Sequence, residues 1–174
     1  MNELKNPVID AILKRRSIRA YSGKPVDKST IKELLIAGMY APSARNQQPW
    51  HFIIIDERQL LDRIRAIHPY ASMLKAAEFA ILVCGDEDLE LSKGYWSVDC
   101  AASTQNILLA AHALGLGAVW LGVYPRKERQ KEIREIFDFP SHIHPFSLIS
   151  VGYPAESKSV PDRFKEDRIR WNKW

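Results

Sequence analysis

The chain has 174 residues, of which 46% are hydrophobic and 26% charged, with a net charge of +4 at pH 7. This length can bury a full core, so we expect one domain over residues 1–174. No apolar run reaches the roughly 18 residues of a membrane span, and the composition excludes a disordered or fibrous protein. The N-terminus shows no signal-peptide pattern and the 2 cysteines have no CxxC spacing, so we expect reduced thiols and a cytoplasmic protein.

Hydrophobic periodicity and turn residues predict a mixed α/β domain, in which the sheet could be parallel or antiparallel. Asn6 and Pro7 are typical of a helix start, and Asp27 can cap the second helix. The wholly apolar run 79–84 indicates a buried strand. In chain order the expected elements are helices over 7–16 and 28–40, a strand over 50–55, a helix over 57–67, a helical turn over 72–75, a strand over 79–84, a helix over 98–114, a strand over 118–123, a helix over 128–137 and a strand over 146–151.

The C-terminal segment turns polar and proline-marked after Tyr153 and ends with two tryptophans, Trp171 and Trp174, on a basic tail. A large apolar patch is rarely left in water on a monomer. We therefore expect the tail to pack on a surface, and a partner subunit is a natural candidate.

Several common functional signatures are missing. The Gly115-Leu-Gly117 pair follows a helix and precedes a strand, which is the reverse of a dinucleotide-binding turn. There is no phosphate-binding P-loop, nucleophile elbow or HExxH motif. His142 and His144 could share one face of a strand, but no cysteine or carboxylate stands near them at ligand spacing. We therefore expect no metal site.

The positive charge collects at the two ends of the chain, in residues 14–19 and 163–173. A duplex-binding protein usually carries a basic stripe along a recognition element, within a known module. Neither is found, so we expect no nucleic-acid partner and no membrane partner. Two short basic clusters suit a small anionic ligand better.

Two segments carry candidate binding residues. Arg15, Arg16, Ser17 and Arg19 could close on a phosphate, because guanidinium groups are forked and permanently charged donors. The alternative is that these cations only complement the C-terminal dipole of the first helix. The polar loop 41–52 could pair with a flat heterocycle, or it could simply connect a helix to a strand.

In this order and spacing, the segments resemble the nitroreductase family. The resemblance rests on RRSIR at 15–19, APSARNQQPWHF at 41–52, LGLGAVWLG at 114–122 and the ending VGYPAESKSVPDRFKEDRIRWNKW at 151–174, and so spans nearly the whole chain. It implies an α+β fold, in which an α/β/α sandwich has a mostly antiparallel central sheet flanked by helices. It also implies a C-terminal arm that extends onto the partner subunit of a homodimer.

The resemblance also implies a flavin mononucleotide (FMN) site at the subunit interface. Its phosphate and ribityl chain would be held by Arg15, Arg16, Ser17 and Arg19, joined by Arg163. A loop from the other subunit would approach the isoalloxazine with Pro42, Ser43, Asn46 and Gln48. The reactive edge of the ring would lie against Trp120, Leu121 and Gly122, with a backbone N–H donated to flavin N5 and Trp120 beside the ring or in the core.

The implied activity is an oxidoreductase reaction in which NADH or NADPH reduces the flavin. An electron-poor acceptor, such as a nitroaromatic or a quinone, then takes the electrons in a ping-pong sequence. No side chain is expected to act as a catalytic residue, because the cofactor carries the chemistry. Residues 85–97 are the candidate for a lid over the site. The alternative is a flavin carrier or redox sensor without turnover.

Overall fold

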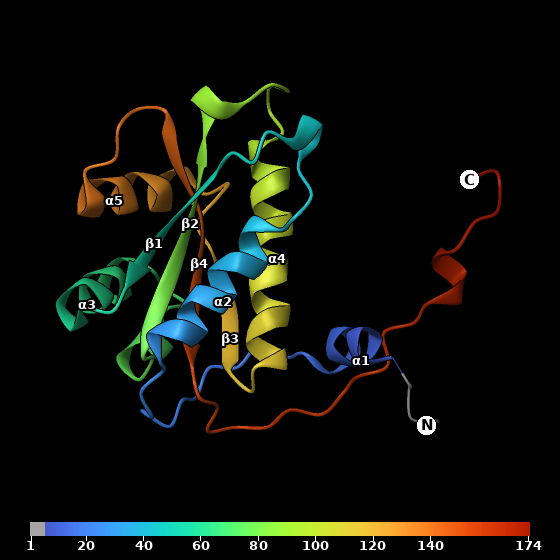
Figure 1. The fold of residues 1–174 in the computed structure, drawn as a ribbon, viewed down its shortest axis with the longest axis horizontal. Coiled ribbons are helices and arrows are strands. Elements are labelled where there is room, and N and C mark those ends of the chain that lie inside the picture. The colour runs from blue at the N-terminus through green and yellow to red at the C-terminus, as the bar shows by residue number, and fades with distance from the viewer. Residues whose placement is uncertain (1–5) are drawn as a thin grey trace.

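The computed structural model describes residues 6–174 (Figure 1). Residues 1–5, on which the signal-peptide expectation partly rests, lie outside this range. The helices and strands are α1 (Pro7–Lys14), α2 (Lys28–Met39), β1 (Trp50–Ile55), α3 (Arg58–Ile67), β2 (Phe79–Asp86), α4 (Trp96–Ala113), β3 (Gly117–Gly122), α5 (Lys127–Phe137) and β4 (Ile143–Gly152). Short 3₁₀ turns are η1 (Ala44–Asn46), η2 (Ser72–Lys75), η3 (Glu87–Leu89) and η4 (Glu166–Arg168).

The four strands form one sheet in the order β1-β2-β4-β3, and each neighbouring pair is antiparallel. This settles the strand direction that the periodicity left open. β2 and β4 are longer than expected and pair as far as Asp86 and Ile143. Pro145 lies at a register shift next to Cys84. Because proline is tolerated in a sheet at a bulge, β4 continues through it.

Alternation along β2 explains why the sheet is covered on both faces. Ala80, Leu82 and Cys84 point into one apolar cluster, together with buried residues of α3 and α5. Phe79, Ile81 and Val83 point into the other cluster, with buried residues of α2 and α4. Successive side chains of a strand alternate between faces, so a wholly apolar strand needs helices on both sides. Figure 1 shows these two helical layers with the sheet between them.

Of the two predicted N-terminal helix caps, at Asn6 and Asp27, only the first makes capping hydrogen bonds. The Asn6 side chain accepts from the backbone N–H groups of Val8 (2.9 Å) and Ile9 (3.3 Å), as its capping role predicts. Asp27 stands at the N-cap of α2, but its side chain makes no capping hydrogen bond, so that prediction was wrong in its detail. The helix begins there because its apolar face packs against the core.

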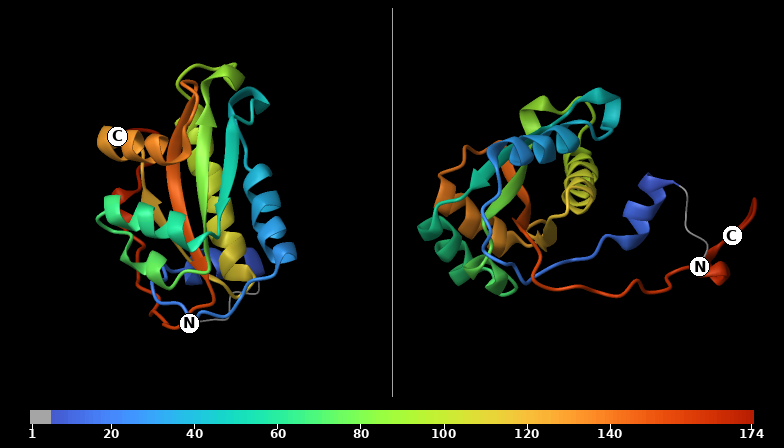
Figure 2. Two further views of the ribbon diagram at one scale, coloured as in Figure 1. Left: turned by 90° about the vertical axis from the view of Figure 1, so that its left-hand side faces the viewer. Right: turned by 60° about the horizontal axis from the view of Figure 1, so that its bottom comes forward.

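Two segments project away from the body of the domain. Figure 2 shows α1 and the C-terminal arm on the same side of the layered domain, where α1 lies beside α4. No residue of α1 is buried, and every residue of the arm from 157 to 174 is exposed. The two tryptophans of the tail, Trp171 and Trp174, are therefore not buried against their own chain. None of the described helices is long and apolar enough to cross a membrane.

Candidate cofactor-binding site

The basic segment that follows α1 runs along the outer edge of β3. Ser17 forms a parallel bridge with Ala118, and the Ile18 backbone N–H donates to the Ala118 carbonyl at 3.0 Å. The approach is close because a Cβ on Gly117 would lie only 2.6 Å from Cγ2 of Ile18. Glycine at this position therefore lets the binding segment lie directly against the strand.

The basic side chains from the two ends of the chain come together here. Burial, and then the guanidiniums of Arg16 and Arg163, lower the pKa of Arg15 from its usual value. Arg16 also donates from Nε to the Ser159 carbonyl at 2.9 Å. Arg16 and Arg163 line a cleft of about 660 Å³ between α1 and the start of the C-terminal arm.

The C-terminal segment is also tied to the backbone of residues 17–20. Lys158 donates from Nζ to the Ser17 carbonyl at 2.7 Å and pairs with Glu156 at 3.4 Å. Glu156 in turn accepts from the Arg19 backbone N–H, a hydrogen bond that lowers the pKa of this carboxyl. Lys158 and Glu156 were not predicted from the sequence, because they bind backbone groups far away in the chain.

A second cleft, of about 410 Å³, opens at the far end of β3. Arg19, Trp120, Leu121 and Gly122 contribute to its lining. A Cβ built on Gly122 would have no atom within 4 Å, so the backbone faces open space there. Trp120 is half-buried and packs against Phe146, with ring centroids 5.6 Å apart. It therefore belongs both to the core and to the wall of the cleft.

The end of β3 is held in place by two side chains, His68 and Arg129, that were not predicted from the sequence. The Gly122 carbonyl lies 3.1 Å from His68 Nε2 and accepts from Arg129 at 2.8 Å. His68 Nδ1 accepts from the Tyr70 backbone N–H at 3.2 Å, so the proton of the neutral imidazole belongs on Nε2. Burial lowers the pKa of His68, which favours this neutral form. The pair fixes the strand end against which the cleft is built.

The polar loop that follows α2 is held in place by side-chain hydrogen bonds. Buried Asp99 accepts from the Ala44 backbone N–H at 3.0 Å and from Gln47 Nε2 at 2.6 Å. Gln47 Oε1 accepts in turn from the backbone N–H groups of Leu91 and Ser92. The loop contains three residues with positive φ, which are Arg45, Asn46 and Gln48.

This loop does not meet the basic segment of its own chain. Asp99 lies in the first turn of α4, whereas His112, near Arg15 and Arg16, lies in the last turn. At about 1.5 Å per residue, these ends of the helix are roughly 20 Å apart. The structure thus brings Arg15, Arg16, Ser17, Arg19, Trp120, Leu121, Gly122 and Arg163 to one side, and Pro42, Ser43, Asn46 and Gln48 to the other.

Residues 85–97 do not form a free-standing lid. Trp96 is buried and stacks on His144, with ring centroids 5.2 Å apart. Glu90 accepts from the backbone N–H groups of Gly94 and Trp96, which closes the segment on itself. Only part of the segment is exposed, including Tyr95. The expectation of a lid is therefore wrong for Trp96, because the ring fills the core.

Together these features define a class of protein: an α/β/α sandwich with a cluster of basic side chains at one end of an edge strand and a cleft at the other. The nitroreductase family model matches residues 12–77 and 68–153. The chain therefore belongs to the nitroreductase family, which is a family of oxidoreductases. This confirms the predicted family and the predicted α+β fold.

Similar proteins agree with this assignment over nearly the whole chain. A protein of Methanothermobacter thermautotrophicus named "Putative NADH dehydrogenase/NAD(P)H nitroreductase" is 49% identical over 98% of this chain and 89% of its own length. A crystal structure of a Parabacteroides distasonis protein of the same description is 42% identical, with a TM-score of 0.94, over 98% of this chain and 100% of that one. An FMN-dependent nitroreductase from Clostridium difficile is 30% identical, with a TM-score of 0.88, over 95% and 99% of the two chains.

Proposed function

We propose that this protein binds FMN and uses NADH or NADPH to reduce electron-poor acceptors such as nitroaromatics or quinones. The observation that carries the proposal is the two-ended site beside β3. Three guanidiniums gather at one end, and Gly122 opens on a cleft at the other. From Ala118 to Gly122 the strand spans roughly 13 Å, at about 3.3 Å per residue. That length suits a ligand with an anion at one end and a flat ring at the other.

The groups at both ends fit FMN. Among residues 6–174, no carboxylate lies within ion-pairing distance of Arg15, Arg16 or Arg163, so their charge is not neutralised inside the chain. Forked guanidiniums are well suited to a phosphate dianion. At the other end, the missing side chain of Gly122 leaves room for a ring to approach the backbone.

The chain's residues bind and orient the cofactor rather than react. When bound, FMN would supply the redox chemistry between a reduced nicotinamide and an electron acceptor. We assign the phosphate and ribityl chain to Arg15, Arg16, Ser17 and Arg163. We assign the ring to Trp120 and the backbone N–H groups of Leu121 and Gly122. Arg19, which the resemblance placed with the phosphate and ribityl chain, lines the same cleft as these residues, so we assign it to the ring as well. His68 and Arg129 hold the Gly122 carbonyl and so keep the strand end in place.

The site is completed by a second copy of the chain. One end of α4 contacts the loop bearing Pro42, Ser43, Asn46 and Gln48, and its other end lies near the basic cluster. The loop is therefore roughly 20 Å from the basic cluster of its own chain, which is the rise of α4 between these two ends. An antiparallel two-fold pairing along α4 would bring the loop of one copy to the basic cluster of the other. Apolar side chains stand exposed on both projecting segments, namely Val8, Ile9, Ile12, Leu13, Phe164, Ile169, Trp171 and Trp174.

The cofactor assignment is tested by measuring FMN affinity in arginine variants. Arg15→Ala and Arg163→Ala each remove one charge-assisted contact, worth about 1.5–3 kcal/mol, which is roughly 10- to 150-fold in Kd. Arg63→Ala is the matched control, because Arg63 is exposed on α3, across the sheet from α4. If the double variant Arg15→Ala/Arg16→Ala retains full flavin content, the phosphate assignment is wrong.

The activity is tested by steady-state oxidation of NADH and of NADPH with menadione or a nitroaromatic acceptor. Because both substrates would occupy the same cleft in turn, double-reciprocal plots should give parallel lines. A flavin-loaded protein that oxidises neither nucleotide with any of these acceptors would contradict the enzymatic role.

A further inference from the structure

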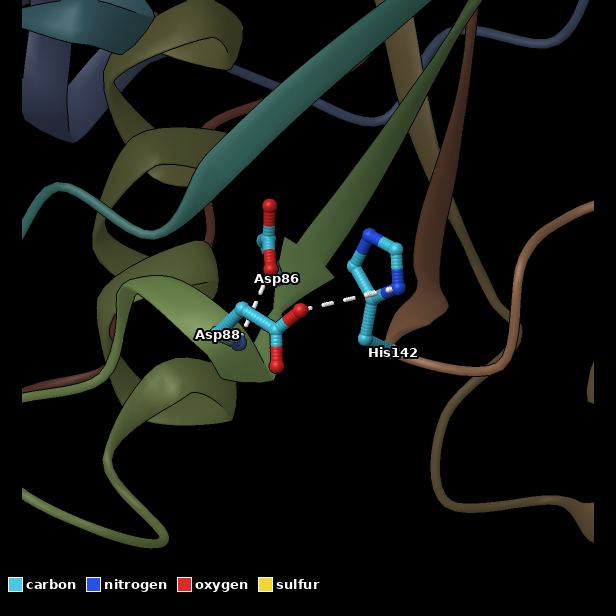
Figure 3. Close-up of side chains that lie close together, drawn as sticks. All are labelled: Asp86, Asp88 and His142. Carbon is cyan, nitrogen blue, oxygen red and sulfur yellow. Dashed lines mark hydrogen bonds and ion pairs between the residues drawn. The ribbon is translucent and has the colours of Figure 1, made fainter.

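Outside the proposed flavin site, two carboxylates and an imidazole converge at one end of the sheet (Figure 3). Asp86 is the last residue of β2, Asp88 lies in η3, and His142 lies in the loop that enters β4. One ligand atom from each side chain lies within 4.8 Å of the other two. Antiparallel pairing of Asp86 with Ile143 brings these distant segments together. The cluster was not predicted from the sequence, because neither carboxylate lies next to His142 in the chain.

The distance between Asp88 and His142 suits an ion between their side chains better than a direct hydrogen bond. His142 Nδ1 lies 3.7 Å from Asp88 Oδ2, outside the roughly 2.7–3.2 Å range of a hydrogen bond. Two ligand atoms at about 2.1 Å from a tetrahedral ion are themselves roughly 3.4 Å apart. A small rotation of Asp88, whose side chain is 76% exposed, would close the remaining difference.

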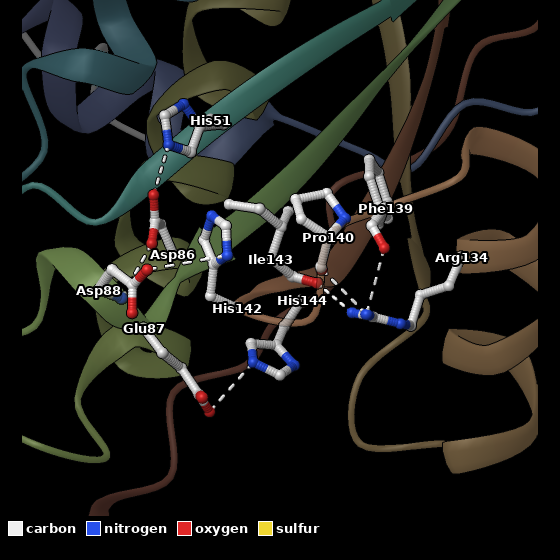
Figure 4. Close-up of polar contacts among 10 residues, drawn as sticks. All are labelled: His51, Asp86, Glu87, Asp88, Arg134, Phe139, Pro140, His142, Ile143 and His144. Atoms are coloured by element: carbon white, nitrogen blue, oxygen red, sulfur yellow. Dashed lines mark hydrogen bonds and ion pairs between the residues drawn. The ribbon is translucent and has the colours of Figure 1, made fainter.

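The surroundings fix the Asp86 carboxylate and the backbone that carries Asp88 and His142 (Figure 4). Asp86 Oδ1 accepts from the Asp88 backbone N–H, and Asp86 Oδ2 lies 2.9 Å from His51 Nε2. The His142 carbonyl accepts from the Glu87 backbone N–H at 3.0 Å. Arg134 donates to three carbonyls of the loop that carries His142, those of Phe139, Pro140 and Ile143. In metal sites, the side chains that bind the ion are commonly held in orientation by further hydrogen bonds.

We infer that Asp86, Asp88 and His142 form a binding site for a divalent transition-metal ion, with water completing the coordination. An imidazole beside carboxylates favours Zn²⁺ and other first-row transition-metal ions over Mg²⁺ or Ca²⁺, which prefer oxygen ligands alone. His51 orients the Asp86 carboxylate through its hydrogen bond. The bound ion would join η3 to the loop before β4. It would lie next to the polar loop's end, because the Pro49 carbonyl accepts from the Asp86 backbone N–H at 2.7 Å.

The experiment is calorimetric titration of ZnCl₂ into the flavin-loaded protein, without a polyhistidine tag and after chelator treatment, with thermal unfolding measured in parallel. We expect one Zn²⁺ per chain and a higher Tm in its presence. Asp88→Asn and His142→Gln should weaken binding by more than about 100-fold. His51→Gln should cost roughly 10- to 100-fold, as loss of a supporting contact does.

Glu87→Gln is the matched control, because this exposed carboxylate lies between Asp86 and Asp88 in the chain but outside the donor set. Its Zn²⁺ affinity should stay within about threefold of the parent protein, since its side chain binds no metal. Absence of Zn²⁺ binding, an equal loss in Glu87→Gln, or equal competition by Mg²⁺ would each overturn the inference. Flavin content of every variant reports separately on the fold and on the proposed FMN site.

Discussion

The substitution Asp99→Asn tests how the polar loop is held. The carboxylate accepts two hydrogen bonds, from the Ala44 backbone N–H at 3.0 Å and from Gln47 Nε2 at 2.6 Å. Asparagine can keep the first with its carbonyl oxygen, but it then turns an NH₂ group toward the NH₂ group of Gln47. Hydrogen bonds to a charged partner contribute about 1.5–3 kcal/mol, and a buried donor left unpaired adds to the loss. We expect a cost of roughly 2–4 kcal/mol, or about 5–15 °C in Tm for a chain of this size.

Circular dichroism during heating, at one fixed protein concentration, measures this cost. Asp62→Asn is the control, because that side chain is 44% exposed and pairs only with Arg65 on the same helix. Its effect should lie within about 0.5 kcal/mol. If Asp99→Asn unfolds at the same temperature as Asp62→Asn, the reasoning about the loop is wrong. Unchanged flavin affinity in a folded but destabilised Asp99→Asn protein would contradict the assignment of the loop to the flavin site.

Three further outcomes are expected. Burial lowers the pKa of His68, so on acidification the unfolded chain binds a proton before the folded chain does. The free energy of unfolding should therefore fall as the pH drops below about 6.5. This fall should be less steep in His68→Gln. Gly117→Ala should cost about 1–3 kcal/mol in denaturant unfolding and weaken FMN binding, because its Cβ would meet Ile18 at 2.6 Å. Burial raises the pKa of Cys84 to about 12, so a thiol reagent should modify it only after unfolding; rapid reaction of the native protein would contradict this.

The elements were predictable because each of them obeys a local rule. β1 was predicted at its observed bounds, since a β-branched run between turn residues leaves little alternative. The α4 helix begins at Trp96, two residues before the predicted start at 98, because Trp96 packs in the core. The strand direction did not follow from the periodicity, since a strand buried on both faces has the same pattern in parallel and antiparallel sheets. The resemblance supplied it.

The candidate site was predictable only where side chains of one segment act together. Arg15, Arg16 and Ser17 are adjacent in the sequence, so their shared chemistry is visible there. His68 and Arg129 were not predictable, because both bind the backbone carbonyl of Gly122. Every residue has a backbone carbonyl, so the sequence does not indicate which one a side chain will bind. The carboxylates near His142 were missed for a related reason, since strand pairing rather than chain neighbourhood brings them close.

The bridge between Ser17 and Ala118 also constrains the order in which the molecule folds. The partner strand β3 lies about a hundred positions further along the chain, and its own pairing with β4 depends on residues that follow it. We therefore expect the basic segment to dock late in folding, after β3 has paired with β4. Because the segment lies at the sheet's edge and several of its hydrogen bonds go to the C-terminal segment, we expect the Ile18 amide to exchange before those of the central strands β2 and β4. A ligand bound there would stabilise the folded state, because it would bind the docked segment and not the open one.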